Sequence, residues 1–290
     1  MHLIFSLYLF IAIPLYGLGG QFLVLPSDAT ELSLGSHPTL QGLSSLNPAL
    51  FSVRKKTPVL LLSQGNWIGD VSIGTLDYSQ NLKNKVFYFG VRYSGLSDLE
   101  FRGDKPQNEP LAYFTSYGLS LKSGLAIKRG NTQYGISFSY ISMGIYIEKS
   151  SGFSMGFGYS VDIKEDVKLG ISLQNIGSMS ALSNDSPQLP KRLLIGYSKF
   201  YNFKKINNTI YNSIELNNIN NFSKYKLSFG NKLSWKQLGL LNGVSLSDNI
   251  IYYSIGLNLN FKNYDITYGI NMNSFNLGIA QIISLRLDLP

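Results

Sequence analysis

Apolar and polar residues alternate along most of the chain, and the pattern is clearest near the C-terminus. In the segment NYDITYGINMN every second residue, from Tyr264 to Met272, is apolar or aromatic, and the residues between are polar or glycine. The alternation continues in the next segment, from Phe275 to Leu289. A period of two directs successive side chains to opposite faces of a β-strand. Both segments are therefore predicted to be strands with one apolar face.

Earlier segments carry the same alternation and are separated by short turn sequences. Their apolar positions are Tyr117, Leu119, Leu121, Leu125 and Ile127; Phe153, Met155, Phe157, Tyr159, Val161 and Ile163; and Ile251, Tyr253, Ile255, Leu257, Leu259 and Phe261. Tight turns such as Arg129-Gly130-Asn131, Lys164-Glu165-Asp166 and Lys262-Asn263 predict antiparallel hairpins. Continued from Pro58 to Pro290, this segmentation gives about fourteen strands, an even number as in single-chain bacterial barrels.

Composition distinguishes a membrane barrel from a soluble β-sandwich, whose strands alternate too. Charged residues make up 14% of the 290 residues, against roughly 25% in soluble domains. Several predicted strands exceed the usual roughly 5–6 residues, whereas a tilted strand needs about 9–11 residues to cross a bilayer. After the N-terminal leader, no apolar run reaches the about 18 residues of a spanning helix. The sequence therefore predicts an all-β fold, an antiparallel transmembrane β-barrel of the bacterial outer membrane.

The first residues form an apolar leader. The run from Leu3 to Ile13 is followed by Pro14 and by small residues at Gly17, Gly19 and Gly20. This order is typical of a secretory signal peptide, with cleavage after Gly17 or Gly19, although no Lys or Arg precedes the apolar run. A retained membrane anchor is the weaker alternative, because the run is shorter than the roughly 20 residues needed to span a bilayer. Residues 1–19 are therefore predicted to be a signal peptide.

The lengths of the connections predict which end of the barrel faces outward. The two longest run from Gly95 to Leu111 and from Ser178 to Leu189, and an even number of predicted strands separates them. They therefore lie at one end, and the tight turns at the other. Outer-membrane barrels keep short turns on the periplasmic side, so the long connections are predicted to face outward.

The polar face of the predicted strands is rich in Gly and Ser, which leaves space inside a barrel of this size. The segment PSDATELSLGSHPTLQGLSSLNPAL, from Pro26 to Leu50, does not alternate and is too polar to face lipid. Within it, Ser27 or Asp28 can cap a short helix that stops at Gly35, and Pro48 ends any continuation at Asn47. Residues 20–57 are therefore predicted to be a plug inside the lumen, and residues 58–290 the barrel.

Two motifs of this segment resemble the N-terminal signature of PorV/PorQ family proteins, which belong with the FadL-type long-chain fatty acid transport barrels. The motifs are LPSDATELSLGS and NPALFS. The resemblance implies a plug motif formed by an acidic residue and an alanine at the helix start, a small residue and an Asn-Pro-Ala turn. In this chain these are Asp28, Ala29, Gly35, Asn47, Pro48 and Ala49. It also implies a barrel of fourteen strands whose N-terminal segment folds into the lumen.

The middle of the chain extends the resemblance. The stretches SSGFSMGFGYSV, LGISLQNIGSMS and LPKRLLIGYS are similar to the family's paired-strand region, Asn-Ile-Gly strand end and Leu-Pro strand start. The chain departs from the pattern at Gly35-Ser36-His37-Pro38, where further Gly and Ala are usual, and at its last residue, Pro290, where an aromatic residue is common.

The resemblance implies two alternative functions. PorV-like members act in type IX protein secretion, where they accept substrates by their C-terminal signal domains, and this is the first hypothesis for the chain. FadL-like members pass long-chain fatty acids or other hydrophobic molecules into the membrane through a side opening, and this is the alternative. The expected partners are outer-membrane lipid and either type IX components and cargo signal domains or a hydrophobic small molecule.

No catalytic, cofactor or metal site is predicted. The chain has no Cys, and once the leader is removed His37 is its one remaining histidine, which is too few for a conventional zinc site. A cation bound by Asp98, Glu100, Asp104 and Glu109 is less favoured than a solvated loop, because Arg102 and Lys105 are interleaved. The glycine-rich GFSMGFGYS lies inside a period-two segment, which disfavours a phosphate loop. The net charge of +8 is scattered near predicted turns, which favours lipid headgroups over nucleic acid as the partner.

Overall fold

The computed structural model describes residues 19–42, 46–51, 57–103, 108–219 and 222–290. The predicted signal peptide, residues 1–19, lies outside the described residues except for Gly19. No helix among the described residues is long and apolar enough to cross a membrane.

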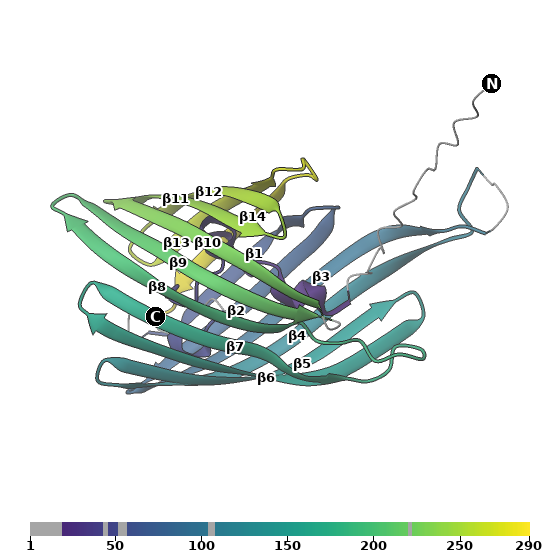
Figure 1. The fold of residues 1–290 in the computed structure, drawn as a ribbon, viewed down its shortest axis with the longest axis horizontal. Helices are drawn as coiled ribbons and strands as arrows, with labels where there is room; N and C mark the ends of the chain where they lie inside the picture. Colours follow the sequence, from purple (N-terminus) through teal and green to yellow (C-terminus); the bar gives the residue numbers. More distant parts are fainter. Residues whose placement is uncertain (1–18, 43–45, 52–56, 104–107, 220–221) are drawn as a thin grey trace, which may run out of the picture.

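The chain forms one closed antiparallel β-barrel, with each strand paired to its neighbours in sequence and β1 paired to β14 (Figure 1). This confirms the predicted fold and the count of strands. The strands are β1 (Val59–Trp67), β2 (Val71–Leu82), β3 (Lys85–Phe101), β4 (Ala112–Arg129), β5 (Thr132–Ile145), β6 (Glu148–Lys164), β7 (Val167–Met179), β8 (Lys191–Phe203), β9 (Ile206–Ile219), β10 (Phe222–Trp235), β11 (Leu238–Ser247), β12 (Ile250–Asn260), β13 (Tyr264–Asn273) and β14 (Ala280–Asp288).

The two faces of the wall differ as the alternation predicts. On β6 the side chains of Phe153, Met155 and Phe157 are exposed on the outside, whereas Ser154 and Ser160 are buried on the inside. A closed ring of paired strands with an apolar outer face satisfies the backbone hydrogen bonds of the paired segments without water, which a membrane-spanning structure requires.

The connections fall into two groups, one at each end of the barrel. The short-turn end holds the connections that follow β2, β4, β6, β8, β10 and β12, and the long-loop end holds the others. The connections after β3 and β7 both lie at the long-loop end, as predicted. The short-turn end also holds the start of β1 at Val59 and the end of β14 at Asp288, which pair with each other.

The predicted loop from Gly95 to Leu111 starts later than predicted, because its first part, up to Phe101, belongs to β3. β3 continues to Phe101 and pairs with β4 down to Ala112, but β2 accompanies it only to Gly95 and β5 accompanies β4 only from Ser116. The β3–β4 hairpin therefore extends beyond its neighbours (Figure 1). Leu99 and Phe101 alternate with the polar Glu100 and pair with β4 after a register shift at Leu96. The charged residues of this segment are typical of a loop, which is why the strand was not predicted.

The predicted last strand begins later than expected, at Ala280 rather than Phe275. The side chain of Asn273 accepts hydrogen bonds from the backbone of Phe275 and of Leu277, each at 3.1 Å, and this turns the chain out of the sheet. Gly278 has φ +118°, which favours glycine. The apolar residues from Phe275 to Ile279 therefore lie in the β13–β14 connection.

The plug lies inside the barrel (Figure 1) and has three short helical parts. They are the 3-10 helix η1 (Gly19–Val24), the α-helix α1 (Ala29–Leu34) and the 3-10 turn η2 (Pro48–Leu50). The helix α1 contacts β10 to β14, η2 contacts β4 to β6, and η1 contacts β4. This confirms a short helical plug in the lumen.

Wall glycines allow the plug backbone to approach closely. Beside α1, Gly230 pairs with Gly243 across β10 and β11, and Gly256 pairs with Gly269 across β12 and β13. A Cβ on Gly230 would lie 2.7 Å from the carbonyl oxygen of Leu34, closer than real contacts permit. The glycine-rich polar face predicted from sequence is thus the surface on which α1 packs.

Candidate functional site

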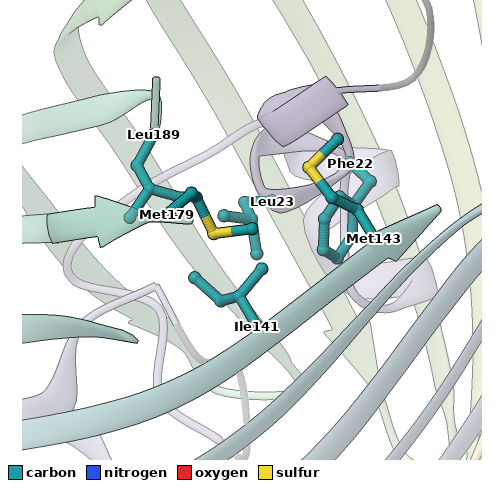
Figure 2. Close-up of a cluster of buried hydrophobic side chains, with 6 residues drawn as sticks. All are labelled: Phe22, Leu23, Ile141, Met143, Met179 and Leu189. Atoms are coloured by element: carbon teal, nitrogen blue, oxygen red, sulfur yellow. The ribbon is translucent and has the colours of Figure 1, made fainter. Parts of the chain in front are cut away.

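Among the described residues, four apolar clusters join the plug to the wall, and one of them lies where the wall itself is interrupted. We call it the seam cluster. It contains two residues of η1, two of β5, one of β7 and one of the β7–β8 connection, and all six are buried (Figure 2). These residues are Phe22, Leu23, Ile141, Met143, Met179 and Leu189.

The interruption is in the pairing between β7 and β8. The pairing ends at Gln174 and Arg192, although β7 continues to Met179. Asn175, with φ +60°, forms a bulge in β7, and its side-chain amide donates to the carbonyl oxygen of Pro190 at 2.9 Å. Leu189 is buried, so the connection turns inward here and contributes to the seam cluster. Bulges end pairing and redirect side chains in this way.

Two interactions hold η1 against the wall. The guanidinium of Arg92 donates to the carbonyl oxygen of Leu23 at 3.2 Å and also to that of Leu25. The ring of Phe22 packs over Gly118 of β4, where a Cβ would collide with it. The last carbonyl groups of a short helix have no backbone partner, and here the charged Arg92 guanidinium is the donor to them.

The interior beside the seam cluster is charged. Tyr88 donates to Asp77 at 2.5 Å, and Arg192 forms a buried ion pair with Glu215 at 2.7 Å. A gap of only about 20 Å³, bordered by Leu23, Asp77, Tyr88 and Lys122, lies between the apolar and the charged side chains. An apolar molecule at the seam cluster therefore meets charged groups along the barrel axis and apolar side chains toward the wall.

The helix α1 is capped as the sequence predicts. Asp28 is the N-cap and accepts from the backbone of Thr30 at 2.8 Å and of Glu31 at 2.9 Å. Glu31 in turn accepts from the backbone of Ser27 at 2.9 Å, an arrangement close to a capping box. Burial, and then the charge of Glu31, raise the pKa of Asp28 to about 6.

The other residues of the predicted plug motif lie in two separate places. Ala29 donates its backbone N–H to Ser284 of β14 at 2.9 Å, and Gly35 ends α1 with φ +91°. Asn47 caps η2 by accepting from the backbone of Ala49 at 3.0 Å, and Pro48 lies against the glycines of β5 and β6. The motif thus holds α1 and η2 against the wall, and none of its residues belongs to the seam cluster.

His37, where the chain departs from the family pattern, is fully buried between plug and wall. Its Nε2 lies 2.8 Å from the carbonyl oxygen of Leu34 and its Nδ1 lies 2.8 Å from the Ser213 hydroxyl, while its ring stacks on Tyr211. Burial lowers its pKa to about 4. The histidine therefore fills a packed position, and its partners are those of a structural residue.

The acidic residues of the outer hairpin do not form a cation site in the part of the chain that the structure describes. Glu100 pairs with Arg102 at 2.7 Å, and Asp98 accepts from Ser97 at 3.1 Å. Asp104 lies outside the described residues. No group of three or more His, Cys, Asp or Glu side chains among the described residues could hold a metal ion.

The seam cluster was not predicted. Phe22 and Leu23 stand next to the predicted signal peptide and form no repeating pattern, so nothing marked them as part of a site. The two stretches that did carry a signal are the Asn-Ile-Gly and Leu-Pro motifs. The structure joins them, because Asn175 of the first bonds to Pro190 of the second.

Comparison with known proteins supports the fold at low sequence identity. A scan against models of protein families and a search of curated proteins each found no match. Among solved structures, the Pseudomonas putida toluene transporter TodX is 10% identical, with a TM-score of 0.68 over 90% of this chain and 98% of that chain. The Ralstonia pickettii toluene transporter TbuX is 11% identical, with a TM-score of 0.63 over 91% and 98%.

A Pseudomonas aeruginosa FadL homologue is 10% identical to the chain, with a TM-score of 0.58 over 91% of this chain and 99% of that chain. These neighbours are channels rather than enzymes. The finer resemblance to PorV/PorQ proteins stays a prediction. The chain has the closed β-barrel fold of TodX, TbuX and the FadL homologue.

Proposed function

We propose that this barrel passes small hydrophobic molecules from the long-loop end into the membrane, with the seam cluster as the point of passage. The alternative function inferred from the sequence is thus preferred to protein secretion. The similarity to TodX and TbuX, both described as toluene transporters, supports this choice. The observation that carries it is the position of the seam cluster beside the interruption between β7 and β8.

The chemistry of the seam cluster suits an exchangeable apolar occupant. Its side chains carry no charge, and two of the six are methionines, which adapt to apolar partners of different shape. An apolar molecule that displaces Phe22 and Leu23 would make, with the wall residues of the cluster, the apolar contacts that these two side chains lose. The buried apolar area then changes little, so exchange costs far less than opening an empty cavity would.

The surroundings direct such a molecule sideways. Arg92, Asp77 and Tyr88 stand next to the seam cluster on the lumen side, and a hydrocarbon cannot replace the hydrogen bonds that these groups would lose. On the wall side, β7 remains paired with β6 beyond Gln174 but has no pairing with β8. Inward displacement of Leu189 together with η1 would leave an apolar route between the strands.

Uptake into proteoliposomes tests the proposal. We expect the wild-type protein to accelerate entry of labelled toluene or oleate, and Ile141→Asn to abolish most of that gain, because a buried amide without partners costs about 1–3 kcal/mol and repels an apolar occupant. The matched control is Ile73→Asn, which changes another buried isoleucine, on β2 and outside the seam cluster. Equal losses in both variants, or a wild type that accelerates neither probe, would contradict the proposal.

A second candidate, association with type IX secretion, is favoured by the β3–β4 hairpin. Its strands beyond Gly95 and Ser116 have free outer edges, and free edges can pair with an extended polypeptide. Phe101 stacks on Tyr146 at 5.6 Å, which directs the hairpin toward the β5–β6 connection. Co-purification of exported proteins with the wild type, but not with a protein that carries Thr115→Pro in the free edge of β4, would support this candidate.

A further inference from the structure

The two ends of the barrel carry opposite charge. In the short-turn connections and the residues next to them, eight basic residues face two acidic ones: Lys83, Lys85, Arg129, Lys164, Lys204, Lys205, Lys236 and Lys262 against Glu165 and Asp166. At the long-loop end the described connections carry mainly acidic residues: Asp70, Glu109, Glu148, Asp185 and Asp248 against Arg102 and Lys191. The basic end of this barrel is its short-turn end, and outer-membrane barrels keep their short turns on the periplasmic side.

A large cavity lies at this basic end, and we call it the vestibule. It has a volume of about 1260 Å³, whereas small-molecule pockets measure roughly 300–1,000 Å³. The plug forms its inner surface through Thr39, Leu40, Gln41, Ala49 and Phe51. An occupant of the vestibule therefore rests directly against the plug.

Lysines from consecutive hairpins line the vestibule. Lys83, Lys128 and Lys164 come from the turns or strand ends of the β2–β3, β4–β5 and β6–β7 hairpins. None of these three lies within 4.0 Å of a carboxylate in the described part of the chain, whereas Lys168 nearby pairs with Asp162 at 2.5 Å. The carboxylates in the same lining are Asp162, Glu165 and Asp166, against six lysines in all. This excess of positive charge attracts a polyanion.

We propose that the vestibule binds an acidic polypeptide segment of a periplasmic partner, which contacts the plug from the short-turn end of the barrel. Charge complementarity indicates the chemistry of this partner, and the size of the vestibule fits an extended chain better than a small ion. Anionic lipid is the less favoured occupant, because these lysines line the lumen, whereas headgroups lie outside the wall. The proposal is independent of whether the barrel transports hydrophobic molecules.

The wall offers a matched pair of variants. K83Q/K128Q/K164Q removes three charges that line the vestibule, and K85Q/K204Q/K205Q removes three at the same end that do not line it. A labelled polyglutamate peptide serves as the probe for the purified full-length protein at low ionic strength. We expect the first variant to weaken binding about tenfold and the second to change it less than about twofold. Added salt should weaken binding to the wild type.

A single cysteine locates the bound peptide, because the natural chain contains none. Gln41→Cys places a thiol on the plug surface of the vestibule, and Asp185→Cys places one at the long-loop end. Polyglutamate should slow thiol labelling at the first position and not at the second. The heat-dependent shift on electrophoresis checks that every variant is folded.

Three results would overturn the proposal. The first is a wild-type protein that does not bind polyglutamate, and the second is an equal loss of binding in both lysine variants. The third is labelling of Gln41→Cys that bound peptide leaves unchanged. If phosphatidylglycerol vesicles bind instead, and K85Q/K204Q/K205Q alone abolishes that binding, the basic end recognises lipid and the proposed partner is wrong.

Discussion

Two parts of the plug, α1 and η1, are held against the wall in different ways. The helix α1 lies on wall glycines that leave no free space, and its backbone is bonded to the wall through Ala29 and Ser284. The helix η1 is held by apolar side chains and by the guanidinium of Arg92, which donates to the carbonyl oxygen of Leu23 in η1 and to that of Leu25 just after it. Close backbone contact has no substitute, whereas an apolar ligand can replace apolar side chains. We therefore infer that α1 is the fixed part of the plug and η1 the exchangeable part.

The largest effect on the plug is expected from a bulky side chain in the contact between α1 and the wall. Gly256→Val places methyl groups where Ser33 now lies, and we expect a cost of about 3 kcal/mol to plug docking. Conductance in planar bilayers should rise sharply while the barrel keeps its heat-dependent shift on electrophoresis. Gly74→Val is the control, because nothing lies within 4 Å of a Cβ at that position. Unchanged conductance in the Gly256 variant would show that α1 is not the fixed part.

Removal of the Arg92 guanidinium should release η1 without disturbing α1. Arg92→Met leaves the carbonyl oxygens of Leu23 and Leu25 without their charged donor, a loss of about 2 kcal/mol. We expect faster uptake of hydrophobic probes with little change in ion conductance. Arg102→Met, in an exposed surface pair, serves as the control. A rise in conductance as large as that of Gly256→Val would mean that the two parts of the plug move together.

The smallest effect should come from pH at the start of α1. Because the pKa of Asp28 in the docked plug is about 6, above its ordinary value of 3.8, docking favours the protonated acid. That contribution is complete below about pH 4 and is lost as the pH rises through 6. Protease protection of the plug should therefore decrease between these values, and Asp28→Asn should reduce the decrease. Asp70→Asn, at the long-loop end, should leave it unaltered.

The fold could be predicted because its determinants are periodic or local. Alternation at residues such as Phe153 and Ser154 indicates which face meets lipid, and Asp28 followed by Glu31 predicts a helix start whatever surrounds it. The sequence also predicted correctly that the two longest connections lie at one end of the barrel and the tight turns at the other. In a closed up-and-down barrel, the end at which a connection lies depends only on the order of the strands.

The candidate site could not be predicted because it depends on contacts between distant segments. Phe22, Met143 and Met179 meet only after the barrel closes, and no spacing in the sequence encodes that meeting. The strand beyond Gly95 was not predicted for a related reason. Its charged residues are typical of a loop, and pairing with β4 is what stabilises the strand.

The bond between Ala29 and Ser284 has a consequence for assembly. Ser284 also donates to Ser63 at 2.8 Å, so one hydroxyl links α1 with β14 and β1, the last and first strands of the wall. These two strands can pair only after the whole chain has been made, which makes their joining the final step of closure. By linkage, a docked helix that bonds at this junction stabilises the closed ring over the open one. The N-terminal helix therefore favours complete barrels and disfavours ones that have closed around an empty lumen.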